Sequence, residues 1–145
     1  MPINNVLIAG AMLSSALFFT TSGFAGTTEI DPAAEVHFES LKDGDSVASP
    51  VTVKFASSGV NIEPAGPAKP KSGHYHLLID TTMSADEMEY AIASDDKHLH
   101  FGKAQTETSV SLTPGKHTLQ IVLGDGAHEL HKTPIMSKVI TVDVK

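Results

Sequence analysis

The chain has 145 residues, a length that suits one domain, and its 17 acidic and 10 basic residues give a formal net charge of −7. This acidic balance argues against nucleic-acid binding, because affinity for phosphates depends on clustered Lys and Arg. The sequence has no cysteine, which excludes disulfides, thiolate metal sites and cysteine nucleophiles. Its unusual feature is the presence of eight histidines.

The first 25 residues have the pattern of a signal peptide. Their apolar run, residues 6–19, is shorter than the span of about 20 residues that crosses a bilayer. Small residues at Gly23 and Ala25 place the predicted cleavage site after Ala25. An uncleaved anchor helix is the alternative, because MPINN at the start carries no Lys or Arg. We expect a periplasmic or secreted protein with no stable membrane insertion after cleavage.

The rest of the chain is predicted to be a mobile polar leader, 26–34, followed by one β domain, 35–145. Apolar and polar residues alternate in short runs separated by turn residues, a pattern typical of strands. The predicted strands are 36–41, 50–55, 74–80, 98–101, 106–112, 117–123 and 139–144. Ser84 and Glu87 fit a capping box and predict a short helix over 84–92. About seven strands without a long helix indicate an all-β, immunoglobulin-like antiparallel sandwich.

Six histidines form three closely spaced pairs, which we interpret as metal ligands. Residues two apart on a strand share a face, with Cα atoms about 6–7 Å apart, so both imidazoles of such a pair can reach one ion. The predicted ligands are His74, His76, His98, His100, His128 and His131.

Alternating strand direction is expected to bring these pairs to one end of the sandwich, together with His37. His117 starts at the other end and is predicted to bond backbone near the turn at 114–115. Spacing leaves open whether the first two pairs meet, because strands in opposite sheets would point them apart. Asp96 and Asp125 are predicted to hydrogen-bond imidazoles and orient them.

Four segments together resemble an exported bacterial family, the domain of unknown function 4399 family. They are SGHYHLLID (72–80), DKHLHFGKAQTE (96–107), PGKHTLQIVLGDGAHELH (114–131) and SKVITVDV (137–144). The family pattern usually has His where Tyr75 stands here, Gly where Ala104 stands and Pro where Leu130 stands. Tyr75 is therefore assigned to packing on the Leu77 face. The resemblance implies an exported domain with no settled activity.

These patterns predict a soluble periplasmic protein that binds a transition-metal ion, Cu or Zn, because both suit imidazole ligands. The alternative is an interaction module without metal, in which structural histidines hold loops that bind an envelope protein or glycan. A metal-dependent hydrolase would need a carboxylate base, and Glu129 or Glu107 are the candidates. No catalytic motif is present, since HELH (128–131) is one residue too short for H-E-x-x-H, and we expect no enzyme.

Overall fold

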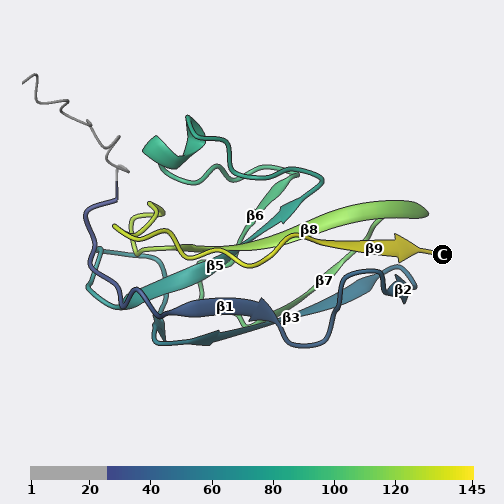
Figure 1. Ribbon diagram of the computed structural model, residues 1–145, viewed down its shortest axis with the longest axis horizontal. Helices are drawn as coiled ribbons and strands as arrows, with labels where there is room; N and C mark the ends of the chain where they lie inside the picture. Colours follow the sequence, from purple (N-terminus) through teal and green to yellow (C-terminus); the bar gives the residue numbers. More distant parts are fainter. Residues whose placement is uncertain (1–25) are drawn as a thin grey trace, which may run out of the picture.

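The computed structural model describes residues 26–145, so the predicted signal peptide lies outside the described residues. These residues form short strands and one single-turn 3-10 helix (Figure 1). The elements are β1 (Glu35–Phe38), β2 (Ser46–Val47), β3 (Val51–Ser58), β4 (Asn61–Ile62), β5 (Ser72–Ile79), η1 (Glu87–Glu89), β6 (His98–His100), β7 (Glu107–Val110), β8 (Gly115–Gly124) and β9 (Ile140–Val144). Each strand predicted from the sequence is present, and the two-residue strands β2 and β4 are additional.

The strands form two layers. One sheet has the order β1-β3-β7; the other has the order β2-β9-β8-β5-β4, with β6 also paired to β5. Figure 1 shows the smaller sheet below the larger one, with the segment that carries η1 above the larger sheet. A sheet of β1, β3 and β7 facing one of β9, β8, β5 and β6 has the strand order of an immunoglobulin-like sandwich. The predicted fold class is confirmed.

The predicted helix over 84–92 is only one turn long. The capping box does form, because the Glu87 amide donates to Ser84 Oγ (3.2 Å) and the Ser84 amide donates to Glu87 Oε2 (2.8 Å). The chain becomes extended at Tyr90, and the Ile92 amide donates to the carbonyl of His128 (2.7 Å). This tertiary bond requires an extended path where the local sequence favours a helix.

The main core lies between the two sheets. Tyr75, Leu77 and Ile79 on β5 point into it, and the Tyr75 ring packs 5.0 Å from that of Phe55 on β3. This confirms the prediction that Tyr75 packs on the Leu77 face. A continuous apolar core on one side of β5 fixes which residues face the other side.

A second apolar cluster covers the opposite face of the larger sheet. It consists of Leu78, Met83, Ile92, Val122 and Leu130, from two strands and two connections. All eight residues of β5 are therefore buried, including the histidines that face away from the main core. The connections 80–97 and 125–139 thus shield this outer face from water.

The leader, residues 26–34, packs against the domain. Ile30 is in the main core, and the carbonyl of Thr28 accepts from the Lys132 amide (3.0 Å). The Lys71 amide donates to the carbonyl of Glu29 (2.8 Å), and Lys132 Nζ donates to Glu29 Oε1 (2.8 Å). These contacts tie the segment to the β domain, where the sequence predicted a mobile leader.

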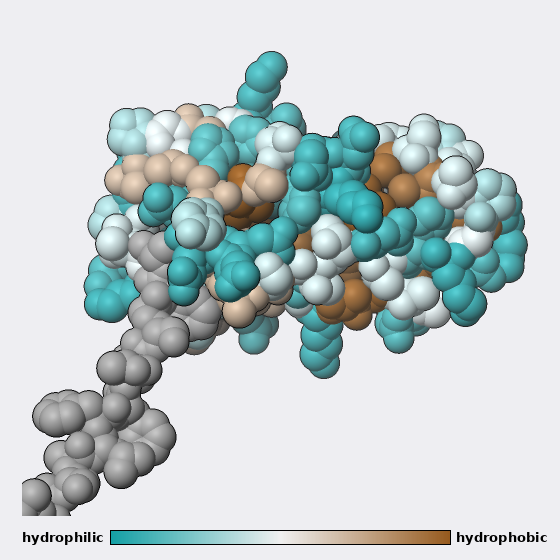
Figure 2. Space-filling model, turned by 90° about the horizontal axis from the view of Figure 1, so that it is seen from above, coloured by the Kyte–Doolittle hydropathy of each residue, from teal (hydrophilic) through white to brown (hydrophobic). Residues whose placement is uncertain are grey.

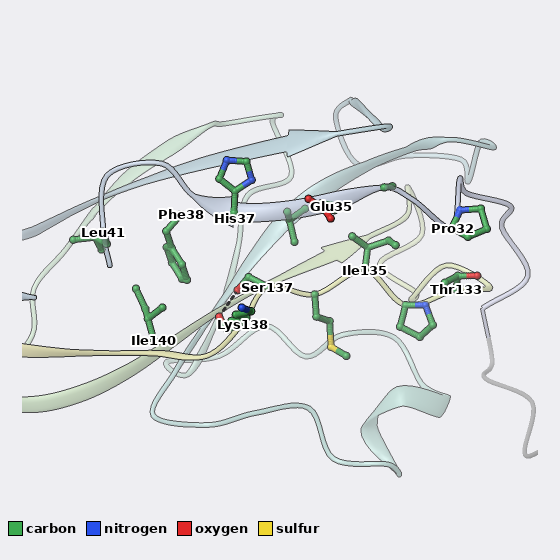
Figure 3. A pocket seen from close by; sticks show the side chains of 14 residues that line it. Pro32, Glu35, His37, Phe38, Leu41, Thr133, Ile135, Ser137, Lys138 and Ile140 are labelled. Carbon is green, nitrogen blue, oxygen red and sulfur yellow. Dashed lines mark hydrogen bonds between the residues drawn. The ribbon is translucent and has the colours of Figure 1, made fainter. Parts of the chain in front are cut away.

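A cavity of about 620 Å³ opens between β1 and the segment that precedes β9 (Figure 3). His37, Phe38 and Ile135 are among its lining residues, so His37 lies beside this cavity and not with the β5 histidines. On the face drawn in Figure 2, hydrophobic residues form separate spots among hydrophilic ones. Tyr90 and Val139 are the large hydrophobic residues exposed in the described part of the chain. In residues 26–145 no helix has the length and apolar character to span a membrane.

His117 is part of a charged contact at the start of β8. Its Nδ1 donates to Asp80 Oδ2 (2.7 Å) and its Nε2 donates to the carbonyl of Thr113 (2.9 Å), as expected for a histidine that bonds backbone near the turn. Both partners are acceptors, so the ring carries both hydrogens. The hydrogen bond to Asp80 raises the pKa of His117 above its ordinary value of 6.5.

We expect the Asp80–His117 pair to stabilise the fold below pH 6.5 and to lose this contribution as pH rises through the raised pKa, because only the charged ring bonds both partners. Asp80→Asn should therefore lower the free energy of unfolding more at pH 6 than at pH 9, as measured by urea titration. Asp96→Asn, at an exposed position, is the control for loss of one acidic charge. An equal loss at both pH values would contradict the pairing.

Candidate metal centre

The register between β5 and β6 brings together histidines that are distant in sequence. The two strands are antiparallel neighbours in one sheet, and His76 lies directly opposite His100. Because they share a sheet, residues that face away from the core on both strands lie on the same face. The question left open by the sequence is thus answered, since the two His-x-His motifs do not point apart.

Four imidazoles converge on this outer face through their Nε2 atoms. His74 Nε2 lies 3.1 Å from His76 Nε2 and 3.2 Å from His100 Nε2. His128 comes from the connection after β8, and its Nε2 lies 3.0 Å from His100 Nε2. Its ring centroid is 5.0 Å from that of His74 and 6.1 Å from that of His76. We call these four residues the imidazole cluster.

Hydrogen bonds alone cannot satisfy the imidazole cluster. The three short contacts form a chain in the order His76, His74, His100, His128, and each joins two Nε2 atoms. An imidazole Nε2 either donates one hydrogen or accepts with one lone pair. His74 Nε2 and His100 Nε2 each take part in two contacts but have only one hydrogen or one lone pair to offer, so at most two of the three contacts are full hydrogen bonds. A cation accepts all four lone pairs at once.

The spacing of the His74, His76 and His100 nitrogens fits a metal centre, and His128 lies next to this group without being part of it. Two nitrogens bound tetrahedrally at the Zn–N distance of about 2.0–2.1 Å lie about 3.3–3.4 Å apart. The observed separations of 3.0–3.2 Å are slightly shorter. The ligand atoms of His74, His76 and His100 all lie within 4.8 Å of one another, so this group could hold a metal ion.

Burial keeps the inner rings uncharged. His74 and His76 are 0% exposed, whereas His100 and His128 are partly exposed. Burial, followed by the charges of His100 and His128, lowers the pKa of His74 to about 4. Burial, followed by the charges of His74 and His100, lowers the pKa of His76 to about 2. Burial also lowers the pKa of His100, so lone pairs remain available for a metal at neutral pH.

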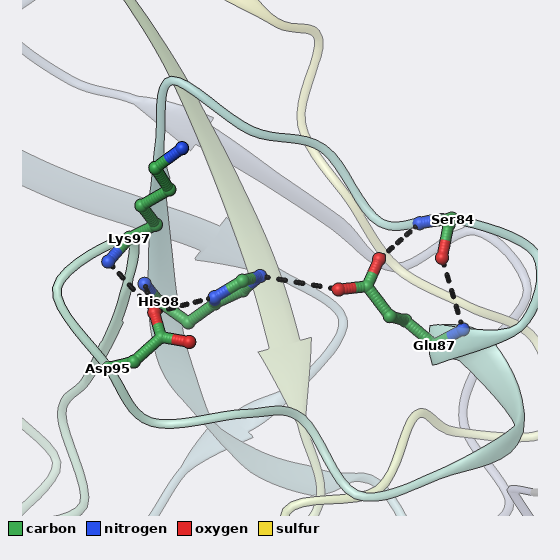
Figure 4. A network of polar contacts seen from close by, with 5 residues as sticks. All are labelled: Ser84, Glu87, Asp95, Lys97 and His98. Atoms are coloured by element: carbon green, nitrogen blue, oxygen red, sulfur yellow. Dashed lines mark hydrogen bonds and ion pairs between the residues drawn. The ribbon is translucent and has the colours of Figure 1, made fainter.

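His98, a predicted ligand, lies outside the imidazole cluster. It pairs with Leu78, two residues further along β5 than His76, and its ring faces the η1 segment. Its Nδ1 donates to Asp95 Oδ1 (2.8 Å), and its Nε2 lies 3.8 Å from Glu87 Oε1 (Figure 4). His98 therefore ties the η1 segment to the sheet.

His131, the second residue of the His128 pair, is also held elsewhere. Its buried ring donates Nε2–H to the carbonyl of Ser72 (2.8 Å), which fixes the connection after β8 against the start of β5. An Nε2 that carries a hydrogen has no lone pair for a metal. The first pair therefore contributes both of its imidazoles to the cluster, whereas each of the other two pairs contributes one. Strand register keeps His98 away from the cluster, and the hydrogen bond to the Ser72 carbonyl keeps His131 away.

The two predicted acidic partners differ in position. Asp96 is exposed and has no hydrogen bond to an imidazole among the described contacts; its neighbour Asp95 makes that bond. Asp125 is buried, but its oxygens accept from Thr28 Oγ1 and from the amides of Ala127 and Glu129. It organises the connection that carries His128 instead of orienting a ring directly.

Two glycines that the sequence analysis did not assign to the site leave room for the rings. A Cβ at Gly124 would lie 2.8 Å from His76 Nε2, and one at Gly102 would lie 2.5 Å from His100 Nε2. Gly124 pairs with His74 across β5 and β8. In the sequence, each glycine directly follows a predicted strand, and this was the only indication of a role. Which histidine ring each glycine contacts depends on how the strands pair.

The fold and this cluster define a small β-sandwich domain in which His74, His76 and His100 could hold a metal ion, with His128 beside them. The family described as a domain of unknown function (DUF4399) matches residues 53–145, and the chain belongs to it. The matched region begins within β3, continues past the end of β9 and contains the whole imidazole cluster. A comparison with curated proteins finds no match.

Proposed function

We propose that this protein binds one transition-metal ion, Zn(II) or Cu(II), through His74, His76, His100 and His128. The observation that carries the proposal is the convergence of four Nε2 atoms from three separate segments, with contacts of 3.0–3.2 Å. Imidazole suits both metals. With the predicted export signal, this would be a metal-binding protein of the periplasm or of the secreted fraction.

The proposed role is binding and not catalysis. Catalytic zinc sites keep a coordination position open for water or substrate, whereas four protein ligands fill a tetrahedral site. A hydrolase would also need a carboxylate base beside the metal. Glu107 lies on β7, in the other sheet, opposite Lys54.

Titration of chelator-treated protein with Zn(II) and Cu(II) tests the proposal. We expect one ion per chain, with an affinity above that of an exposed His tag, because two ligands are already buried and neutral. His74→Ala combined with His100→Ala should abolish this site. The matched control, His37→Ala combined with His117→Ala, removes two histidines outside the imidazole cluster and should leave binding intact. Unchanged affinity in the first double variant would overturn the proposal.

Elemental analysis of protein purified from its native compartment identifies the ion. A stoichiometric transition metal would support the proposal, and its identity would distinguish zinc from copper.

A further inference from the structure

Asp125 is a buried acidic group with no cationic partner among the described residues. It is 1% exposed, and no ion pair found in residues 26–145 includes it. Its carboxylate accepts three hydrogen bonds, one on Oδ2 from Thr28 Oγ1 and two on Oδ1 from backbone amides. Only acceptors are required of it, which fits the ionised form. A buried charge is costly unless an opposite charge lies near.

The imidazole cluster lies next to Asp125 in the fold. Asp125 directly follows Gly124, which lies opposite His74 on β5. Its charge also acts on His74, where it favours the positive form. The imidazole cluster supplies no negative charge, and Asp125 is the one acidic residue that is buried in residues 26–145. Coulomb attraction between these charges is stronger in the protein interior than in water.

Asp125 also fixes the position of the fourth ligand. Its carbonyl accepts from the His128 amide (3.0 Å), and its own amide donates to the carbonyl of Glu129 (2.8 Å). His128 has a φ of 69°, which a residue other than glycine rarely adopts without such support. Thr28 connects this turn to the packed leader, 26–34, across 97 residues of chain.

We propose that Asp125 is the counter-charge of the bound divalent ion, and that the Thr28–Asp125 hydrogen bond positions His128 as its fourth ligand. This inference rests on the proposed metal function and assigns residues that bind no metal themselves. The two roles differ in one testable respect. The charge of Asp125 acts on the ion whether or not His128 is present, whereas Thr28 acts only through His128.

A double-mutant cycle on Zn(II) affinity, measured by competition with a chromophoric chelator, separates the two roles. Asp125→Asn keeps the shape and an acceptor oxygen but removes the charge, and should weaken binding about 10- to 100-fold. The same loss should persist in a His128→Ala background. Thr28→Val should weaken binding about 3- to 10-fold in the otherwise unchanged protein and have no effect in the His128→Ala background. Asp96→Asn removes an exposed acidic charge and should change the affinity less than about twofold.

The outcomes discriminate between explanations. Should Asp125→Asn behave like Asp96→Asn, the counter-charge role is wrong. If its effect disappears in the His128→Ala background, Asp125 only holds the turn. Asp125→Ser, measured in parallel, provides a second uncharged variant in case the Asn protein does not fold. A protein with none of these substitutions that fails to bind Zn(II) would refute the proposed function itself, and this inference with it.

Discussion

Metal-free protein is expected to lose about 3–4 kcal/mol of its free energy of unfolding between pH 7 and pH 5. In the folded state the pKa of His74 is about 4 and that of His76 about 2, whereas both are near 6.5 in the unfolded chain. At a pH below 6.5 and above the folded-state pKa of each ring, the unfolded chain binds a proton that the folded protein does not. Stability therefore falls as pH decreases below 6.5, by about 1.4 kcal/mol per pH unit for each of the two rings.

Urea titrations at pH 7, 6 and 5 in the presence of a chelator measure this loss. A variant with His74→Leu and His76→Leu lacks the two imidazoles whose pKa is lowered to about 4 and about 2, so its stability should depend much less on pH over this range. His37→Gln, which changes an exposed histidine, should retain the full dependence. A flat profile for the unsubstituted protein would mean that the two rings are accessible to protons in the folded state.

The strands and the sandwich were predictable because their signals are local. Alternation in PVTVKF and HTLQIVL follows the two-residue period of a strand with one buried face. The same alternation placed Leu77 in the core and His74 and His76 on the opposite face, as the structure shows. The burial of that opposite face was not predictable, since it depends on Met83, Ile92 and Leu130 from connections that have no regular period.

Sequence spacing also cannot predict which histidines lie close together in the fold. A one-residue change in the β5–β6 register would turn the β6 histidines to the other face, so this contact is set by pairing and not by sequence distance. His98 and His131 resemble the other histidines in the sequence, but each is bonded to a neighbour, Asp95 in one case and the Ser72 carbonyl in the other. Only the folded structure distinguishes these two histidines from ligands.

Replacing Gly124 or Gly102 by alanine should weaken metal binding by about 100-fold, while leaving the domain folded. The added methyl group at Gly124 would lie 2.8 Å from His76 Nε2, and at Gly102 it would lie 2.3 Å from His100 Cε1. Each ring must move to avoid the contact, and the atoms displaced include the nitrogens proposed to bind the metal. Neither glycine has a positive φ, so alanine fits the backbone, and its lower entropy in the unfolded chain favours folding by about 0.5–1 kcal/mol.

These substitutions should lower metal affinity without lowering the stability of the metal-free domain. A destabilised domain would lose metal binding and thermal stability together, whereas the structure predicts lower affinity without a lower melting temperature in chelator. Gly66→Ala is the matched control, because a Cβ there meets no atom within 4 Å and the residue has no positive φ. It should leave both quantities unchanged. If Gly102→Ala and Gly124→Ala also retain full affinity, the ion is not held by the Nε2 atoms of His100 and His76, and the arrangement of ligands described above is wrong.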